Sequence, residues 1–273
     1  MGNAQYENPI LYSSDPNLSL LEKNLSVLST KNDPRLGSID ELQHKTTNEI
    51  LFRKEILLKD QSLLTSANLI KLKRMVNLNH LNLLRIYGFT IHISNKGPSK
   101  LSIFFEHFKS DALLQFLERK RKNAFFKEEE LYFSLLDVIH ALGYLQSNKI
   151  SLGNLTPQTV LMSNNGDIRL LNLALFESAY SDLKNVVKGA QSPYTAPELL
   201  KHQGKSDQQR ASDVDVYKAD MFSAGMIFLH GALLEEPTAC YNWNDSTFNA
   251  TKLRELIERV RARYGDRLAK ILS

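Results

Sequence analysis

The sequence predicts an α+β chain of two lobes, a small β-rich N-terminal lobe with one main helix and a larger α-helical C-terminal lobe. Residues 25–58 contain apolar runs with strand character, separated by polar turns. Residues 62–79 change to a helical period, and the second half of the chain is mostly helical. These changes define a lead-in at 1–24, an N-terminal lobe at 25–108 and a C-terminal lobe at 109–273.

The strands of the first lobe follow from its apolar runs and turns. LSVLST begins at Leu25, a turn follows at Asn32-Asp33-Pro34, and the tip of the next hairpin is expected at Thr46–Glu49. HLNLLRIYGFTIH and LSIFFEHF predict two more strands after the helix. We therefore expect five strands and one helix, preceded by a polar lead-in.

The helices of the second lobe follow from one apolar stripe and one apolar run. The fourteen residues that directly follow Asp220, MFSAGMIFLHGALL, are apolar almost all round. The run is too short to cross a bilayer, so it predicts a buried central helix. The polar segment 201–216 is expected to be an exposed loop. The basic row Arg259, Arg263 and Arg267 is expected on a solvated helix face. The stripe consists of Leu131, Leu135, Val138, Leu142 and Leu145.

Composition excludes several classes of protein. The net charge of +4, from 34 Lys and Arg against 30 Asp and Glu, is too small to argue for nucleic acid. The single cysteine, Cys240, excludes an internal disulfide framework and suits a reducing cytosol, so we expect a cytoplasmic protein. No transmembrane segment is expected. Gly2 follows Met1 as in N-myristoylated proteins, although Tyr6 stands where that pattern has Ser or Thr.

Three motifs occur in a familiar order. ISLGNLTPQTVLM (150–162) keeps the apolar frame and proline of I-x-H-R-D-L-K-P-x-N-I-L; Ala196-Pro197-Glu198 matches A-P-E; and Asp220–Gly225 matches D-x-W-S-x-G. From about Leu25 to the C-terminus, the order of elements resembles the eukaryotic protein kinase fold. The resemblance implies a protein-kinase-like bilobal fold, with Asp220 anchoring the backbone of the catalytic loop.

The chemically active positions of that family differ here. Leu152, Gly153 and Asn154 stand where the family has His, Arg and the catalytic Asp. Thr156 replaces the lysine, Thr159 replaces the metal-binding Asn, and Asn172-Leu173-Ala174 replaces D-F-G. Because phosphoryl transfer depends on positioned charge and metal ligands, the resemblance implies a degenerate member with no catalytic residue, no metal and no cofactor.

The first lobe aligns with the family by register. Gly37 takes the place of the third glycine of the phosphate loop, Ile39 that of its valine, and Lys54 that of the phosphate-binding lysine. Phe52 replaces the alanine that roofs the adenine. Lys71 falls where the helix glutamate should pair with Lys54, so the lysine is expected to point to solvent.

The remaining positions complete a vestigial nucleotide pocket. Phe105 is the gatekeeper, Glu106 and Phe108 form the hinge, and Leu161 should join Phe52 and Phe105 in filling the pocket. Asp111 either touches ribose, as in many kinases, or caps the next helix, which we favour. A buried, continuous stack is also expected, formed by Met75, Ile86, Leu152 and Leu173.

The sequence thus predicts a catalytically inactive kinase homologue that acts as a protein-binding, scaffolding or allosteric module. One alternative is a structural component of a larger assembly, for instance a cytoskeletal one. Another is an atypical kinase that binds nucleotide weakly through Lys54 and Asp111. The family also pairs its A-P-E glutamate with a later arginine, and the sequence leaves open whether Arg267 serves or the last subdomain is missing.

Overall fold

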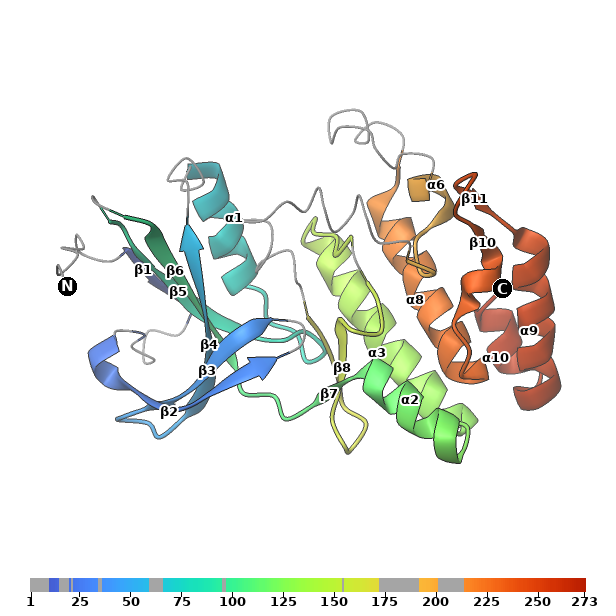
Figure 1. Cartoon of the computed structure of the whole chain (residues 1–273), viewed down its shortest axis with the longest axis horizontal. Coiled ribbons are helices and arrows are strands. Elements are labelled where there is room, and N and C mark those ends of the chain that lie inside the picture. The colour runs from blue at the N-terminus through green and yellow to red at the C-terminus, as the bar shows by residue number, and fades with distance from the viewer. Residues whose placement is uncertain are drawn as a thin grey trace. The chain divides into compact units, whose positions relative to one another are not determined.

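The structure is a computed structural model that describes residues 10–14, 20, 22–33, 36–58, 66–94, 97–153, 155–171, 192–200 and 214–273. Its described residues form two compact units, one ending at Lys109 and the other starting at Ser110. The first unit is β-rich and carries one long helix, and the second is mainly helical (Figure 1). The α+β fold expected from sequence is therefore confirmed.

The first unit is built on one antiparallel sheet of six strands, in the order β1-β5-β6-β4-β3-β2. The sequence predicted five strands, and the extra strand comes from the lead-in. A 3-10 turn at Glu22–Asn24 leads from the lead-in into β2. The strands are β1 (Ile10–Ser13), β2 (Leu25–Asp33), β3 (Gly37–His44), β4 (Ile50–Leu58), β5 (Ile86–His92) and β6 (Ser99–Glu106).

Helix α1 (Ser66–Val76) follows β4 and packs against β5. The predicted helical period of 62–79 begins in residues 62–65, which lie outside the described residues, and the described helix ends at Val76. Leu72, Met75 and Val76 are buried, whereas Ile70 is 59% exposed. The helix thus presents one apolar face to the sheet, as its spacing predicted.

The lead-in also contributes to the core of this unit. Leu20 is fully buried, and it belongs to a cluster on the sheet face opposite to the one that bears Lys54. The register places Leu42 beside Leu51 on that face, and Phe104 lies two residues from the partner of Leu51. Residues before 25 therefore belong to the fold of the lobe. The complete cluster is Leu20, Leu25, Leu42, Leu51, Tyr87 and Phe104.

A charge ladder crosses the same face of the sheet. Arg53 on β4 contacts Asp40 on β3 at 2.7 Å and Glu55 at 3.3 Å, and Glu55 contacts Lys100 on β6 at 3.0 Å. Burial alone would raise the pKa of Asp40, but hydrogen bonds from Arg53 and Thr30 outweigh it and hold that pKa below its ordinary value. The four charges therefore connect three neighbouring strands.

The second unit begins with β7 (Asp111–Ala112), α2 (Leu113–Asn123) and α3 (Glu128–Ser147). Strand β7 pairs with β8 (Val160–Met162), which pairs with β9 (Ile168–Leu170). The apolar stripe predicted for α3 is confirmed, since each of its five members is at most 6% exposed; they are Leu131, Leu135, Val138, Leu142 and Leu145.

Helix α8 (Val216–Leu233) is the buried central helix that the sequence predicted, and it packs against α3 (Figure 1). Asp215 caps its first turn by accepting hydrogen bonds from the N–H groups of Tyr217 and Lys218. A β-carbon at Gly231 would lie 3.1 Å from the Leu131 side chain. Glycine therefore allows the two helices to approach closely.

The remaining elements surround α8. They are α6 (Pro197–Leu200), a 3-10 turn (Pro237–Cys240), β10 (Tyr241–Asn242), β11 (Thr247–Phe248), α9 (Ala250–Tyr264) and α10 (Asp266–Ile271). The three arginines of the basic row are exposed, as expected. Arg259 also pairs with Glu235 at 2.8 Å, and the Arg263 guanidinium lies 3.4 Å from the ring centre of Phe125. Most of the predicted loop 201–216 lies outside the described residues.

Candidate functional site

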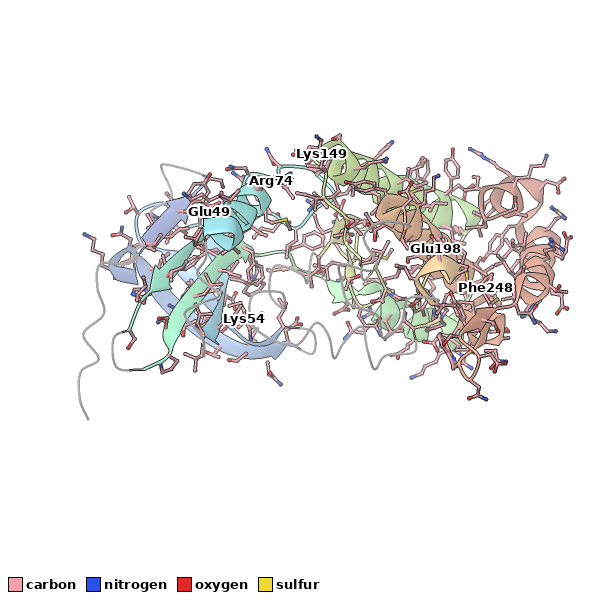
Figure 2. The ribbon with its side chains drawn as sticks, turned by 90° about the horizontal axis from the view of Figure 1, so that it is seen from above. Glu49, Lys54, Arg74, Lys149, Glu198 and Phe248 are labelled. Atoms are coloured by element: carbon pink, nitrogen blue, oxygen red, sulfur yellow. The ribbon has the colours of Figure 1, made fainter. Side chains whose placement is uncertain are left out.

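Lys54 lies in the middle of β4, and its ammonium is bound to the backbone of β3 (Figure 2). It donates a hydrogen bond to the carbonyl of Ser38 at 3.2 Å. Gly37 has φ +68°, and a β-carbon there would lie 3.4 Å from the Lys54 nitrogen. The Lys54 ammonium therefore lies in an exposed position, as expected, but it is held by the first residues of β3.

Helix α1 offers Lys54 no carboxylate. Its sequence, SANLIKLKRMV, contains no Asp or Glu. Lys71 lies in this helix as expected, but its side chain lies outside the described residues. An ion pair between Lys54 and a residue of α1 is therefore excluded by composition alone.

The ring of Phe52 lies among aromatic neighbours from the end of β6. Its centre is 5.7 Å from that of Phe105 and 4.6 Å from that of His107, with interplanar angles of 48° and 51°. The Lys31 ammonium lies 5.7 Å from the Phe52 ring centre. Offset rings at such distances attract one another. Phe52 is therefore held in place from both β2 and β6.

Glu41 ties this aromatic cluster to the sheet. Its carboxylate contacts Lys31 at 2.6 Å and His107 Nε2 at 3.1 Å, and it accepts a hydrogen bond from Ser29 at 2.9 Å. The Lys31 ammonium and the Ser29 hydroxyl lower the pKa of Glu41. Neither Glu41 nor His107 was predicted from the sequence. Glu41 lies directly opposite Phe52, a relation that appears only once the strand register is known.

The predicted hinge continues from this cluster. The N–H of Glu106 donates to Arg85 O at 2.9 Å, and the N–H of Phe108 donates to Glu106 O at 3.1 Å. The gatekeeper Phe105 is 2% exposed. Ile39 is also buried, in β3. All of these positions lie in the first unit, and Phe105 contacts the Phe52 ring.

In the second unit, Asp220 holds the loop that follows α3. Its two carboxylate oxygens accept hydrogen bonds from the N–H groups of Leu152 and Gly153, both at 2.8 Å. Burial raises the pKa of Asp220, against the lowering effect of these two N–H groups. Gly153 has φ +73°, a conformation that other residues rarely adopt. Asp220 therefore has the anchoring role that the resemblance implied.

The two threonines of this loop are engaged with each other. The Thr159 hydroxyl accepts from the N–H of Thr156 and donates to the carbonyl of Thr156, both at 3.0 Å. Thr159 is 2% exposed. A neutral, buried hydroxyl used in this way is a poor ligand for a divalent cation. Asn154 and Asn172 lie outside the described residues.

Asp111 does not cap α2, so the capping prediction was wrong. Its carboxylate pairs with Arg119 at 2.8 Å. The side chain of Gln115 instead accepts a hydrogen bond from the Ala112 N–H at the start of the helix. Asp111 precedes α2 and Arg119 lies eight residues later, within the helix, so a sequence pattern for helix caps does not reveal this ion pair.

Two expectations join residues of different units and stay predictions. Leu161 is 4% exposed within the second unit, so its part in filling a pocket beside Phe52 is untested. Met75, Ile86 and Leu152 are each buried within their own unit. The fourth member of that stack, Leu173, lies outside the described residues.

Arg267 does not pair with the A-P-E glutamate. Its guanidinium lies 4.2 Å from the ring centre of Tyr132. Glu198, labelled in Figure 2, makes no ion pair within the part of the chain that the structure describes. The hypothesis that Arg267 serves as the partner of Glu198 was therefore wrong.

The sheet with its single helix, the lysine on β4 and the aspartate that anchors the loop after α3 define a kinase-type domain. Residues 35–269 match the family described as protein kinase domain, and the chain belongs to that family.

Similar proteins carry kinase names. Over 177 residues the chain is 25% identical to serine/threonine-protein kinase sgk-1 of Caenorhabditis elegans, an alignment that covers 63% of the chain and 36% of the relative. It is 27% identical over 110 residues to serine/threonine-protein kinase SCH9 of Saccharomyces cerevisiae, covering 40% and 13%. With the Aurora kinase of Schizosaccharomyces pombe, identity is 26% over 159 residues, covering 57% and 39%. The chain thus spans well under half of each relative.

Within the described residues, no helix is long and apolar enough to cross a membrane. The longest, α3, has twenty residues, but its first turn carries three glutamates. The most apolar, α8, is the buried central helix of the second unit.

Proposed function

We propose that this chain is a catalytically inactive member of the protein kinase family that acts by binding protein partners. One observation carries the proposal: the residue at the adenine-roof position is Phe52, and its ring is fixed by Phe105, His107 and Lys31. A nucleotide base would have to displace a ring that is held on several sides. The described residues therefore do not fit a nucleotide in the family's manner.

Charges at the active positions support the same conclusion. Phosphoryl transfer needs metal ligands, a carboxylate that accepts a proton and cations that stabilise the transferred group. This chain has Asn154 and Asn172 where the family has aspartates, and the Thr159 hydroxyl is bound to Thr156. Helix α1 supplies no glutamate. Losing one such group could be compensated, but losing these together, with Lys54 retained, leaves little of the metal binding and the charge stabilisation.

The scaffold, in contrast, is kept. Asp220 still holds its loop through two hydrogen bonds, and the helical stripe of α3 is still buried. A fold maintained without its chemistry is suited to presenting surfaces, so we propose protein partners, and the lone Cys240 suits a cytosolic setting. A permanent structural role in a larger assembly, such as a cytoskeletal one, is the main alternative.

The names of the relatives favour a second candidate, an atypical kinase that binds nucleotide through Lys54 and Asp111. Both side chains are already engaged, Lys54 with the Ser38 carbonyl and Asp111 with Arg119. A nucleotide would therefore have to share or displace both contacts. For this reason we rank it below the inactive module.

A thermal-shift titration with ATP, with and without Mg²⁺ or Mn²⁺, separates these functions. Ligand that binds only the folded state raises the melting temperature, and a concentration of about 100 times Kd stabilises by about 2.7 kcal/mol. We expect no shift in the parent and a shift in Phe52→Ala, which opens the space of the ring. Phe133→Ala, which removes a ring that is 63% exposed in the second unit, is the matched control.

A metal-dependent shift in the parent, accompanied by phosphate transfer to a test protein, would refute the proposal. If neither the parent nor Phe52→Ala shifts, the inactive assignment stands, but the ring is not its cause. The charges around Glu41 would then be the next candidates for substitution.

A further inference from the structure

The lead-in strand covers the outer edge of β5. Strand β1 pairs with β5 in antiparallel register, from Ile10 opposite Ile91 to Ser13 opposite Gly88. The ladder continues beyond the strand, where the N–H of Ser14 donates to Tyr87 O at 2.9 Å. Strand β1 is the last strand of the sheet order, so β5 is its only neighbour among the strands that the structure describes.

Gly88 has no β-carbon, and this allows β1 to lie close to β5. A β-carbon there would lie 2.1 Å from the carbonyl oxygen of Tyr12, 2.5 Å from the Leu20 side chain and 3.0 Å from the Ser13 backbone. Distances below 3.0 Å do not occur for real β-carbons, and two of these contacts are with backbone that cannot swing away. Any side chain at position 88 is thus incompatible with the docked strand.

Tyr12 is the anchor of the strand. Its ring stacks on Phe89 with centres 5.7 Å apart and an interplanar angle of 26°. Its hydroxyl donates to Asn77 Oδ1 at 3.0 Å, and the Lys73 ammonium lies 5.3 Å from the ring centre. The ring therefore contacts the sheet on one side and the C-terminal end of α1 on the other.

The docked strand is short and partly exposed. It has four residues, its Ile10 and Leu11 side chains are 38% and 41% exposed, and the hydrogen bond between Tyr12 and Asn77 is exposed. A short edge strand depends on backbone hydrogen bonds and one anchor, which is how extended peptides are recognised at sheet edges.

We propose that the outer edge of β5 is a binding site for an extended peptide with an aromatic anchor, occupied here by the chain's own residues 10–14. The backbone of β5 supplies the ladder, Gly88 allows the close approach, and Phe89, Asn77 and Lys73 select an aromatic side chain with a hydroxyl. The proposal does not depend on whether the family's catalytic site is active, because it concerns another edge of the sheet.

A labelled peptide of residues 8–16, NPILYSSDP, tests this site in the full-length chain. In the parent, the tethered strand competes at a high effective concentration, so the peptide should bind poorly. In Tyr12→Ala, the tethered strand loses its anchor, and fluorescence anisotropy should show saturable binding at least tenfold tighter than in the parent. The same peptide with alanine in place of its tyrosine should bind at least tenfold more weakly.

Two further variants in the Tyr12→Ala background locate the site. Gly88→Ala should abolish peptide binding while the chain still melts cooperatively. If that variant does not fold, Asn77→Ala decides the matter, since it should weaken binding several-fold. Ile70→Ala, which removes an exposed side chain from α1, the helix that Asn77 follows, is the matched control and should leave binding unchanged.

Three results would overturn the proposal. The first is the absence of peptide binding to Tyr12→Ala at millimolar concentration, and the second is an equal loss of binding in Asn77→Ala and Ile70→Ala. Light scattering that shows a dimer in the parent and a monomer in Tyr12→Ala would assign the strand to a second copy, against occupation by the same chain.

Discussion

Acidification should destabilise the second unit through His230. This histidine lies in α8, is 7% exposed, and has its Nδ1 2.8 Å from the hydroxyl of Tyr194, whose ring lies parallel to it at 6.2 Å. Burial, followed by the positive charge of Arg121, lowers the pKa of His230 from 6.5 to about 4. The folded chain therefore keeps this imidazole neutral at a pH where the unfolded chain protonates it.

The sign and size of the effect follow from that difference. Between pH 6.5 and about 4, the unfolded state binds a proton that the folded state does not, so the free energy of unfolding falls as the pH falls. At about 1.4 kcal/mol per pKa unit, the contribution of His230 is about 3 kcal/mol. The loss is complete below about pH 4, and above about pH 7 the contribution no longer changes.

Urea unfolding of the parent and of His230→Gln, at about pH 7 and about pH 4, measures this contribution. Glutamine can still hydrogen-bond Tyr194 but does not titrate, so the variant should lose about 3 kcal/mol less on acidification than the parent. Other carboxylates and histidines cancel in this double difference. His140→Gln, which removes an exposed histidine of α3, should behave like the parent. Equal losses in the parent and in His230→Gln would refute the reasoning.

Two further predictions concern the loop after α3 and the end of that helix. Asp220→Ala leaves the buried N–H of Leu152 and the part-buried N–H of Gly153 without this acceptor and should cost about 2–4 kcal/mol in urea unfolding. Asp220→Asn keeps one acceptor and should cost about half, and equal costs would contradict the two-bond account. Lys149, labelled in Figure 2, closes α3 with φ +58°, so Lys149→Gly should stabilise by about 0.5–1 kcal/mol in thermal melts, and Lys149→Val should destabilise. An unchanged melting temperature in both variants would contradict strain at this position.

The sequence predicted the parts of the fold that depend on periodicity. The stripe of α3 and the all-round apolar α8 were recognisable because burial requires apolar residues at fixed spacing. Strand β1 was missed because its four residues follow polar sequence and gain stability from a distant partner, β5. The dependence of that pairing on Gly88 is likewise visible only once the two strands lie together.

The candidate site was predictable where residue type alone decides the chemistry. The absence of a glutamate in α1 and the hydroxyl at position 159 follow directly from the sequence. The contacts of Lys54 and Asp111 did not follow, since each depends on which neighbour lies nearest in space. The same holds for Glu41, whose role arises from strand pairing.

The charge ladder of the first unit has a consequence for how the sheet assembles. In the observed register, Asp40 lies opposite Arg53, so opposite charges face each other across β3 and β4. A slip of two residues would keep every side chain on its proper face. In one direction it would bring Asp40 opposite Glu55, where like charges repel, and in the other it would bring Asp40 opposite Leu51, where the ion pair is lost. Apolar patterning alone tolerates such an even slip. The charge ladder therefore favours the observed register over registers that the apolar pattern alone would allow.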